Sequence, residues 1–175
     1  MNVRKMCRLA LMTALICIAA PLSVPIGPIP ISLATLTVYL AGALLGPVDG
    51  VIAVALYILL GAVGLPVFSG FGAGVAKLIG VTGGYIIGYL PCAALTGAGA
   101  KFWGDRKWVY PVAMVVGTIA CYVLGTVWFM VQTGTGLAAS MSSCVLPFLP
   151  GDAIKIVIAS VLAAILRERV KLFAN

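Results

Sequence analysis

The 175-residue chain is poor in the side chains that most enzyme and metal chemistry uses. It has no histidine and only four acidic residues, against 11 lysines and arginines. Its five cysteines are scattered without a CxxC spacing, which argues against a zinc site or a disulfide framework and favours small apolar packing residues. We therefore expect no bound metal and no cofactor.

Charge of either sign is scarce along the whole chain. Charged residues make up 9% of it and hydrophobic residues 63%, whereas a soluble domain is roughly 25% charged. A helix needs about 20 apolar residues to cross the hydrocarbon core of a membrane. Long uncharged runs fill most of the sequence, at 9–48, 50–76, 78–100 and 108–151. We predict an integral membrane protein in which residues 1–175 form a single membrane domain.

The net charge of +7 comes from three clusters rather than from a surface suited to nucleic acid. Nine of the eleven cations are Arg4, Lys5, Arg8, Lys101, Arg106, Lys107, Arg167, Arg169 and Lys171. Such clusters are typical of the cytoplasmic flanks of membrane spans. Both termini are therefore expected in the cytoplasm, which requires an even number of spans, and no nucleic-acid partner is expected.

Hydropathy and turn residues divide the chain into six segments. We predict an all-α bundle of six transmembrane helices at about 6–22, 32–46, 50–64, 82–101, 108–131 and 151–168. The first segment resembles a signal peptide, but more membrane sequence follows it, so we interpret it as a retained helix.

The extracellular connections differ in kind from the cytoplasmic ones. Residues 21–32, 64–84 and 132–147 are rich in Gly, Pro and Ser, and Lys77 is their only charge. Irregular backbone at membrane depth survives only where protein or a cavity surrounds it. These loops are therefore predicted to roof a ligand pocket in the outer half of the bundle.

Asp152 and Lys155 stand at the start of the last helix, in the stretch PFLPGDAIKIVIA. At a spacing of three residues, two side chains lie roughly 60° apart around a helix and share a face. From the residues alone, three interpretations stay open: Asp152 is an N-cap or first-turn residue that complements the helix dipole, Lys155 extends outward to lipid headgroups, or the two point inward as a pair. An inward pair would offer an anionic acceptor and a cationic donor to a polar ligand.

The glycine-rich segment 69–85 contains neither GxGxxG nor GxxxxGK[ST], so it is not a nucleotide site. One interpretation is a flexible, closely packed loop. The other is a lid, in which Phe68 and Phe71 cover an apolar ligand while Lys77 and Tyr85 supply hydrogen-bond donors.

Ala10 and Ala14 form a small-xxx-small pair on one face of the first helix. Small residues allow two helices to approach closely within a membrane. Their spacing does not distinguish packing inside the bundle from a flat surface for an external helix.

Four strings in combination resemble the BioY family, the biotin-specific S-components of energy-coupling-factor (ECF) transporters: PIPISLATLTVYLAGALLGP (28–47), LYILLGAVGLPVFSGF (56–71), TGGYIIGY (82–89) and PFLPGDAIK (147–155). The resemblance implies a six-helix protein of the prokaryotic cell membrane that captures biotin from outside with high affinity. It implies docking on a transmembrane T-component that is coupled to two cytoplasmic ATPase subunits. ATP hydrolysis is then expected in the partners, and this chain is not expected to be an enzyme.

The resemblance also assigns roles to residues. The family's aspartate and lysine at the start of helix six, associated with biotin binding, match Asp152 and Lys155, and its alanine docking face on helix one matches Ala10 and Ala14. Ligand contacts from the second helix are expected mainly from Thr35 and Tyr39.

The orientation of the ligand stays open from the resemblance. We favour Asp152 accepting from the ureido N–H groups of biotin and Lys155 donating to the ureido oxygen, rather than a lysine–carboxylate contact. Burying the neutral bicycle deepest demands less desolvation than burying the carboxylate.

Three alternative functions remain: an S-component for another vitamin, a membrane-embedded enzyme with Asp152 as general base, and a proton-coupled carrier. The last two are disfavoured because the other acids, Asp49, Asp105 and Glu168, all fall on the cytoplasmic side.

Overall fold

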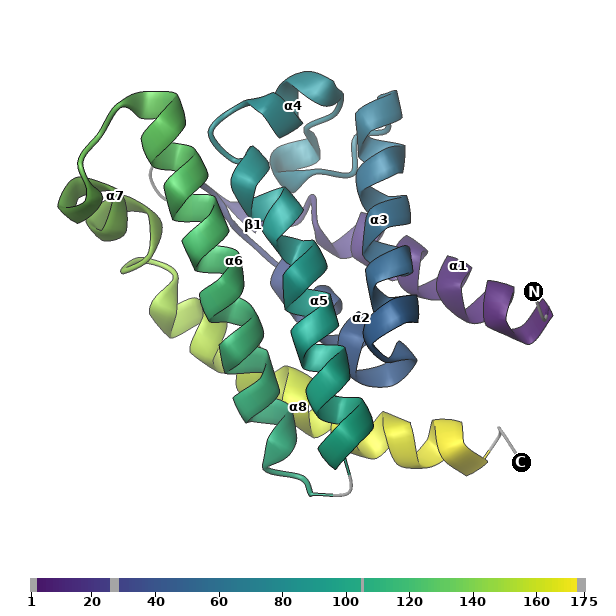
Figure 1. Ribbon diagram of the computed structural model, residues 1–175. Helices are drawn as coiled ribbons and strands as arrows, with labels where there is room; N and C mark the ends of the chain where they lie inside the picture. The colour runs from purple at the N-terminus through teal and green to yellow at the C-terminus, as the bar shows by residue number, and fades with distance from the viewer. Residues whose placement is uncertain (1–2, 26–28, 105, 173–175) are drawn as a thin grey trace.

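The computed structural model describes residues 3–25, 29–104 and 106–172 (Figure 1). Over those residues the chain is mainly helical. Its helices are α1 (Val3–Ala19), α2 (Ala34–Leu45), α3 (Pro47–Val63), α4 (Val75–Ile79), α5 (Gly83–Trp103), α6 (Val109–Thr133), α7 (Leu137–Cys144) and α8 (Leu149–Leu172). Each of the six predicted helices has a counterpart, in α1, α2, α3, α5, α6 and α8, whose ends lie within four residues of the predicted ones.

The three Gly/Pro/Ser-rich connections are more structured than the sequence predicted. The connection 21–32 holds two short antiparallel strands, β1 (Ser23–Val24) and β2 (Ile31–Ser32), so the described fold is not purely α. The connection 64–84 contains a 3-10 turn, η1 (Ser69–Phe71), followed by α4, and the connection 132–147 contains α7. Apolar Gly/Pro-rich segments carry no clear periodicity, yet their backbone groups still need hydrogen-bond partners where water is scarce, and short elements supply them.

Helices α5 and α6 lie side by side in the middle of the fold, with α2, α3 and α8 packed against them (Figure 1). Small residues allow this close approach. A Cβ atom added at Gly88 of α5 would meet Cys121 Sγ of α6 at 3.0 Å, and one added at Gly117 of α6 would meet the Cys92 carbonyl at 2.9 Å. The tight packing brings the inner faces of α5 and α6 to the same cavity.

The outer surface of the bundle is apolar. Exposed side chains such as Val123 and Val131 on α6 and Val157 on α8 face outward. In the described part of the chain, two helices are long and apolar enough to cross a membrane, at Val109–Thr133 and Leu149–Arg167, and α2 and α3 are shorter apolar helices. A surface of this kind suits lipid, which solvates aliphatic side chains.

Candidate ligand-binding site

The inward pair at the start of α8 is the polar centre of the site. Asp152 and Lys155 are 4% and 7% exposed, and 2.9 Å separates Asp152 Oδ1 from Lys155 Nζ. The backbone N–H of Asp152 already donates to the Phe148 carbonyl at 2.8 Å, so this residue lies inside the first turn of α8 rather than at its cap. The structure thus places Asp152 in the first turn, where it complements the helix dipole, and not at the N-cap; it also turns Lys155 inward toward Asp152 and not outward to lipid headgroups.

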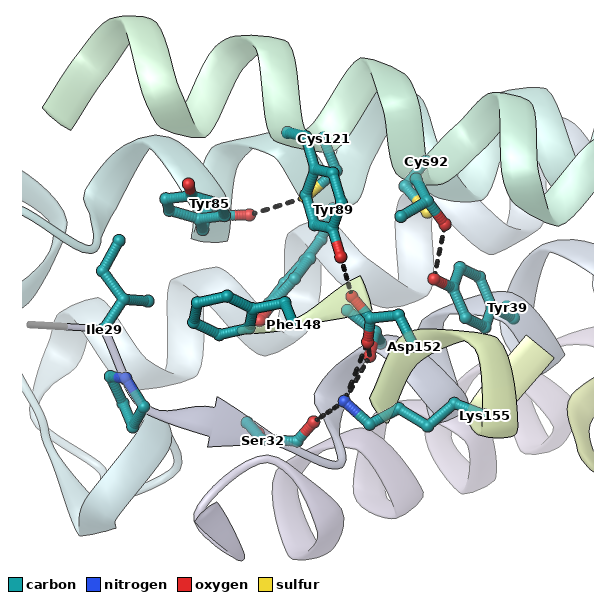
Figure 2. A pocket seen from close by; sticks show the side chains of 14 residues that line it. Ile29, Ser32, Tyr39, Tyr85, Tyr89, Cys92, Cys121, Phe148, Asp152 and Lys155 are labelled. Atoms are coloured by element: carbon teal, nitrogen blue, oxygen red, sulfur yellow. Dashed lines mark hydrogen bonds and ion pairs between the residues drawn. The ribbon is translucent and has the colours of Figure 1, made fainter. Parts of the chain in front are cut away.

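Three elements surround the ammonium group of Lys155 (Figure 2). Its Nζ donates to the Ser32 carbonyl of β2 at 2.7 Å, to Thr35 Oγ1 of α2 at 3.2 Å and to Asp152 Oδ1. A lysine ammonium has three protons. All three therefore have an acceptor supplied by the protein.

The carboxylate of Asp152 is held from two sides. Oδ1 accepts from Lys155 and from the Thr35 hydroxyl at 3.2 Å, and Oδ2 accepts from the Tyr122 hydroxyl of α6 at 2.5 Å. An ionised carboxylate has about four acceptor positions, two on each oxygen. Within the described structure, Oδ2 keeps one of its positions open, so the site retains a single strong acceptor.

A cavity of about 40 Å³ adjoins the pair. It is lined by Ile29, Pro30, Ser32, Thr35, Tyr39, Tyr85, Tyr89, Cys92, Thr118, Cys121, Tyr122, Phe148, Asp152 and Lys155. Pockets for drug-sized ligands are typically about 300 Å³ or more, whereas this volume suits a few water molecules. A larger ligand therefore enters only if lining side chains or the connecting segments move.

Five of the 14 lining residues are aromatic, and two tyrosines besides Tyr122 have hydrogen-bonded hydroxyl groups. Tyr39 OH lies 2.5 Å from Thr118 Oγ1, and Tyr85 OH donates to the Cys144 carbonyl at 3.1 Å. Tyr85 also stacks on Phe148, with ring centroids 6.5 Å apart and an interplanar angle of 18°. The aromatic rings suit a ligand with a flat or apolar body.

Cys144, which accepts the hydrogen bond of Tyr85 through its backbone carbonyl, lies in α7. Burial raises the pKa of its thiol, which favours a neutral packing group there.

The structure brings together five of the predicted ligand-binding residues. Thr35, Tyr39, Tyr85, Asp152 and Lys155 all line the one cavity, although they come from α2, α5 and α8. Tyr85 makes its hydrogen bond within the protein, and Thr35 bridges the two charges of the pair.

The other three predicted residues do not line it. Phe68 is fully buried in the core, where its ring fills the space beside Gly61 and meets Tyr57 edge to face at a centroid distance of 5.6 Å. Phe71 is 66% exposed, and Lys77 is half-buried outside the cavity. Neither ring lines the cavity in this structure, so a role for them in covering a ligand stays a prediction. The burial of Phe68 in the core stabilises the fold by removing a large apolar surface from water.

Several lining residues were missed by sequence reasoning, namely Tyr89, Cys92, Thr118, Cys121 and Tyr122. One signal could have found them. On α5, the spacing Tyr85–Tyr89–Cys92 is four then three residues, which repeats on one helical face, and Thr118–Cys121–Tyr122 shows a similar spacing on α6. The Ser32 carbonyl is a backbone group, for which side-chain identity gives no signal.

The structure also decides between the two positions considered for Ala10 and Ala14. Both are exposed, whereas Leu9, Met12 and Ile16 form the buried face of α1. Packing inside the bundle is therefore excluded, and the alanines lie on an outer surface of the molecule.

Taken together, an apolar exterior and a buried charged pair beside an aromatic cavity define a helical membrane protein with a small-molecule site. A family profile described as the BioY family matches residues 1–172. The chain belongs to the BioY family.

Individual relatives agree with that assignment. A probable biotin transporter BioY of Pyrococcus horikoshii is 36% identical over 163 residues, covering 93% of this chain and 96% of the relative. The biotin transporter BioY of Thermotoga maritima is 36% identical over 165 residues, covering 94% and 96%. Among solved structures, the S-component for biotin from an ECF-type ABC transporter superposes with a TM-score of 0.89 at 34% identity, covering 95% of this chain and 92% of that one.

Proposed function

We propose that this protein is the biotin-capturing S-component of an ATP-driven ECF vitamin transporter. The observation that carries the proposal is the buried Asp152–Lys155 pair beside an aromatic cavity, in a chain that belongs to the BioY family. Relatives named as biotin transporters, and a similar structure described as an S-component for biotin, support biotin as the ligand.

The chain acts as one membrane domain whose six long helices cross the prokaryotic cell membrane, with both termini in the cytoplasm. The positions of the basic clusters favour this orientation, because cations concentrate on cytoplasmic flanks. The Asp152 end of α8 then lies in the outer half of the membrane, beneath the connections that hold β1, β2, α4 and α7. These extracellular segments roof the pocket and separate to admit the ligand.

In the pocket, the ureido group of biotin meets the charged pair. Asp152 Oδ2 has an acceptor position open to a ureido N–H, and the 3.2 Å bond from Lys155 to Thr35 is the longest of the three at Nζ, hence the one that a ureido oxygen replaces most easily. A ligand carboxylate at this point would place a second anion beside Asp152 where water is scarce, which is strongly unfavourable. The bicycle then packs among the tyrosines, and the carboxylate points away from the pair.

The chain depends on partners for its energy. The outer alanines of α1 provide the docking face for a helix of the transmembrane T-component, which is coupled to two cytoplasmic ATPase subunits. A membrane-embedded enzyme would need Asp152 as a free base. Here that carboxylate already accepts three hydrogen bonds, one of them from a lysine.

Calorimetry on the purified protein in detergent tests the proposal. Biotin is expected to bind without ATP or partner subunits, because the polar pocket residues all come from this chain. Riboflavin and thiamine, measured on the same preparation, are expected not to bind. Binding of either of these without binding of biotin would show that the protein serves another vitamin.

A ligand series tests the orientation. Biotinamide keeps the ureido group but lacks the carboxylate charge. If the ureido group meets the pair, Lys155→Ala weakens biotin and biotinamide by the same factor. A large loss for biotin with little loss for biotinamide would instead place the carboxylate on Lys155.

A further inference from the structure

A second cavity lies near the far end of α8. Arg167 lines it, and the helix rises about 22 Å from Asp152 to Arg167 at 1.5 Å per residue. The cavity has a volume of about 350 Å³ and is lined by Ala43, Leu44, Leu45, Gly46, Pro47, Val48, Asp49, Lys101 and Arg167. It is therefore formed where the α2–α3 turn meets the ends of α5 and α8 (Figure 1).

Two cations in this cavity have no carboxylate partner among the described side chains. Arg167 is held in place, since its guanidinium donates to the Ala100 carbonyl and to Tyr110 OH at 3.3 Å and lies over the Tyr110 ring. Lys101 is exposed, with its Nζ 5.8 Å from the centroid of the Phe102 ring.

The one described carboxylate in the lining belongs to Asp49, and it is already paired with Lys5 at 2.7 Å. The described groups at this end thus carry a net positive charge. That charge favours an anion.

The aromatic residues beside the cavity indicate its depth in the membrane. Phe102 and Trp103 directly follow Lys101 in the chain, and Trp108 comes shortly after them. Their side chains are 68%, 62% and 60% exposed, respectively. Exposed tryptophans concentrate at the level of lipid headgroups. The cations of this cavity therefore lie at the level of lipid phosphates.

The other wall of the cavity is aliphatic. Leu44, Leu45 and Val48 line it, and Val48 is 66% exposed. A cavity with cations on one side and aliphatic groups on the other matches a ligand that joins a phosphate to a hydrocarbon chain. An acidic protein segment would use the cations but leave the aliphatic wall uncovered.

We propose that this cavity binds the phosphate of an anionic phospholipid, with Lys101 and Arg167 as its cationic ligands and the α2–α3 turn against the start of an acyl chain. The assignment of this site to one leaflet rests on the proposed function: because that function places both termini in the cytoplasm, the site faces the inner leaflet. Basic pockets between membrane helices on that side are known as headgroup sites. The inference concerns lipid binding and is independent of the biotin pocket.

Native mass spectrometry after extraction from lipid nanodiscs tests the site. The nanodiscs contain phosphatidylcholine with phosphatidylglycerol, and the retained phosphatidylglycerol is counted per protein. Lys101→Gln is expected to lower retention about fivefold, corresponding to about 1 kcal/mol for one interfacial cation. Lys107→Gln is the matched control, because Lys107 is exposed in the connection that follows α5 but does not line the cavity. Asp49→Asn should raise retention, since it removes the negative charge and releases Lys5.

Two further measurements distinguish a lipid phosphate from free inorganic phosphate, and the proposed lipid site from the proposed biotin function. Inorganic phosphate added to pure phosphatidylcholine nanodiscs is expected to bind far more weakly than the lipid, because it cannot use the aliphatic wall. Biotin binding is measured on the same preparations, and Lys101→Gln is expected to leave it unchanged. If the parent protein did not bind biotin at all, that result would count against the proposed function but not against the lipid site. Equal retention by the Lys101 and Lys107 variants would overturn the lipid site. Weaker assembly with the T-component at unchanged lipid retention would identify the cavity as a protein contact instead.

Discussion

Two aspartate–lysine pairs of nearly equal length stand in different surroundings in this molecule, one buried and the other partly exposed. The Asp152–Lys155 pair spans 2.9 Å with side chains 5% and 9% exposed, and the Asp49–Lys5 pair spans 2.7 Å with side chains 24% and 43% exposed. The buried pair also receives hydrogen bonds from Tyr122 and Thr35. The distance between the charges is therefore a poor guide to their role.

The surroundings decide what each pair contributes. An exposed pair gains about 0–1 kcal/mol, because water screens it and two long side chains must be held still. A buried pair has lost its water and persists only where other groups complete its hydrogen bonds. The buried pair therefore depends on its neighbours in α2, α6 and β2 more than the partly exposed pair depends on its own.

The largest expected effect comes from breaking the buried pair. Asp152→Asn and Lys155→Ala should each weaken biotin binding at least about tenfold, or 1.4 kcal/mol. Each should also destabilise the fold, by about 3–5 kcal/mol where an unpaired charge stays buried. Calorimetry and thermal unfolding on the same samples measure both effects.

The double variant sharpens this test. Replacing both charges with alanine should recover part of the stability lost in Lys155→Ala, since no unpaired charge remains, but should not restore biotin binding. Normal binding by both single variants would show that the pair has no part in ligand capture.

The next largest effect is expected on the face of α1 that carries Ala10 and Ala14. Ala10→Leu combined with Ala14→Leu should lower co-purification with the T-component about fivefold or more, because leucines hold a partner helix away. Biotin binding should stay near normal, since both residues point away from the cavity. Ala138→Leu, at an exposed position of α7, is the control. Lost biotin binding with an intact complex would refute the docking assignment.

The amino-acid sequence was enough to predict the long helices, because uncharged runs and Gly/Pro turns mark them in a membrane protein. It also placed Asp152 and Lys155 on one face, since charges are rare enough here to stand out. Which faces of α5 and α6 turn inward was not predicted. In lipid both faces of a helix are apolar, so hydropathy no longer separates core from surface.

The loop residues show a different limit. Phe68 and Phe71 are chemically identical and three residues apart, yet one is fully buried and the other 66% exposed. The space beside Gly61 decides this difference, and that space exists only once α3 and η1 have packed together.

A smaller effect is expected from removing one neighbour of the buried pair. Tyr122→Phe deletes the hydroxyl that donates to Asp152 Oδ2, and a hydrogen bond to a charged group is worth about 1.5–3 kcal/mol. We expect a loss of stability near the lower figure, measured by denaturation in detergent. Tyr57→Phe is the matched control, because Tyr57 is also buried but packs against Phe68 and does not line the cavity. Equal stability of the two variants would mean that the pair does not depend on Tyr122.

The smallest effect is expected from the partly exposed Asp49–Lys5 pair. Lys5→Gln should change stability by less than about 1 kcal/mol, with the difference shrinking further at high salt. Biotin affinity should be the same as in the parent protein. A loss as large as that of Lys155→Ala would remove the distinction between the two pairs.

A crystal structure of the protein with biotin tests most directly whether the Asp152–Lys155 pair is the polar end of the ligand site. The ureido nitrogen is expected about 2.7–3.2 Å from Asp152 Oδ2, with the bicycle among Tyr39, Tyr85 and Tyr122 and the carboxylate away from the pair. The volume of the cavity should be larger than the 40 Å³ of the structure without ligand. Biotin bound elsewhere on the protein, or held by its carboxylate at Lys155 Nζ, would contradict this assignment.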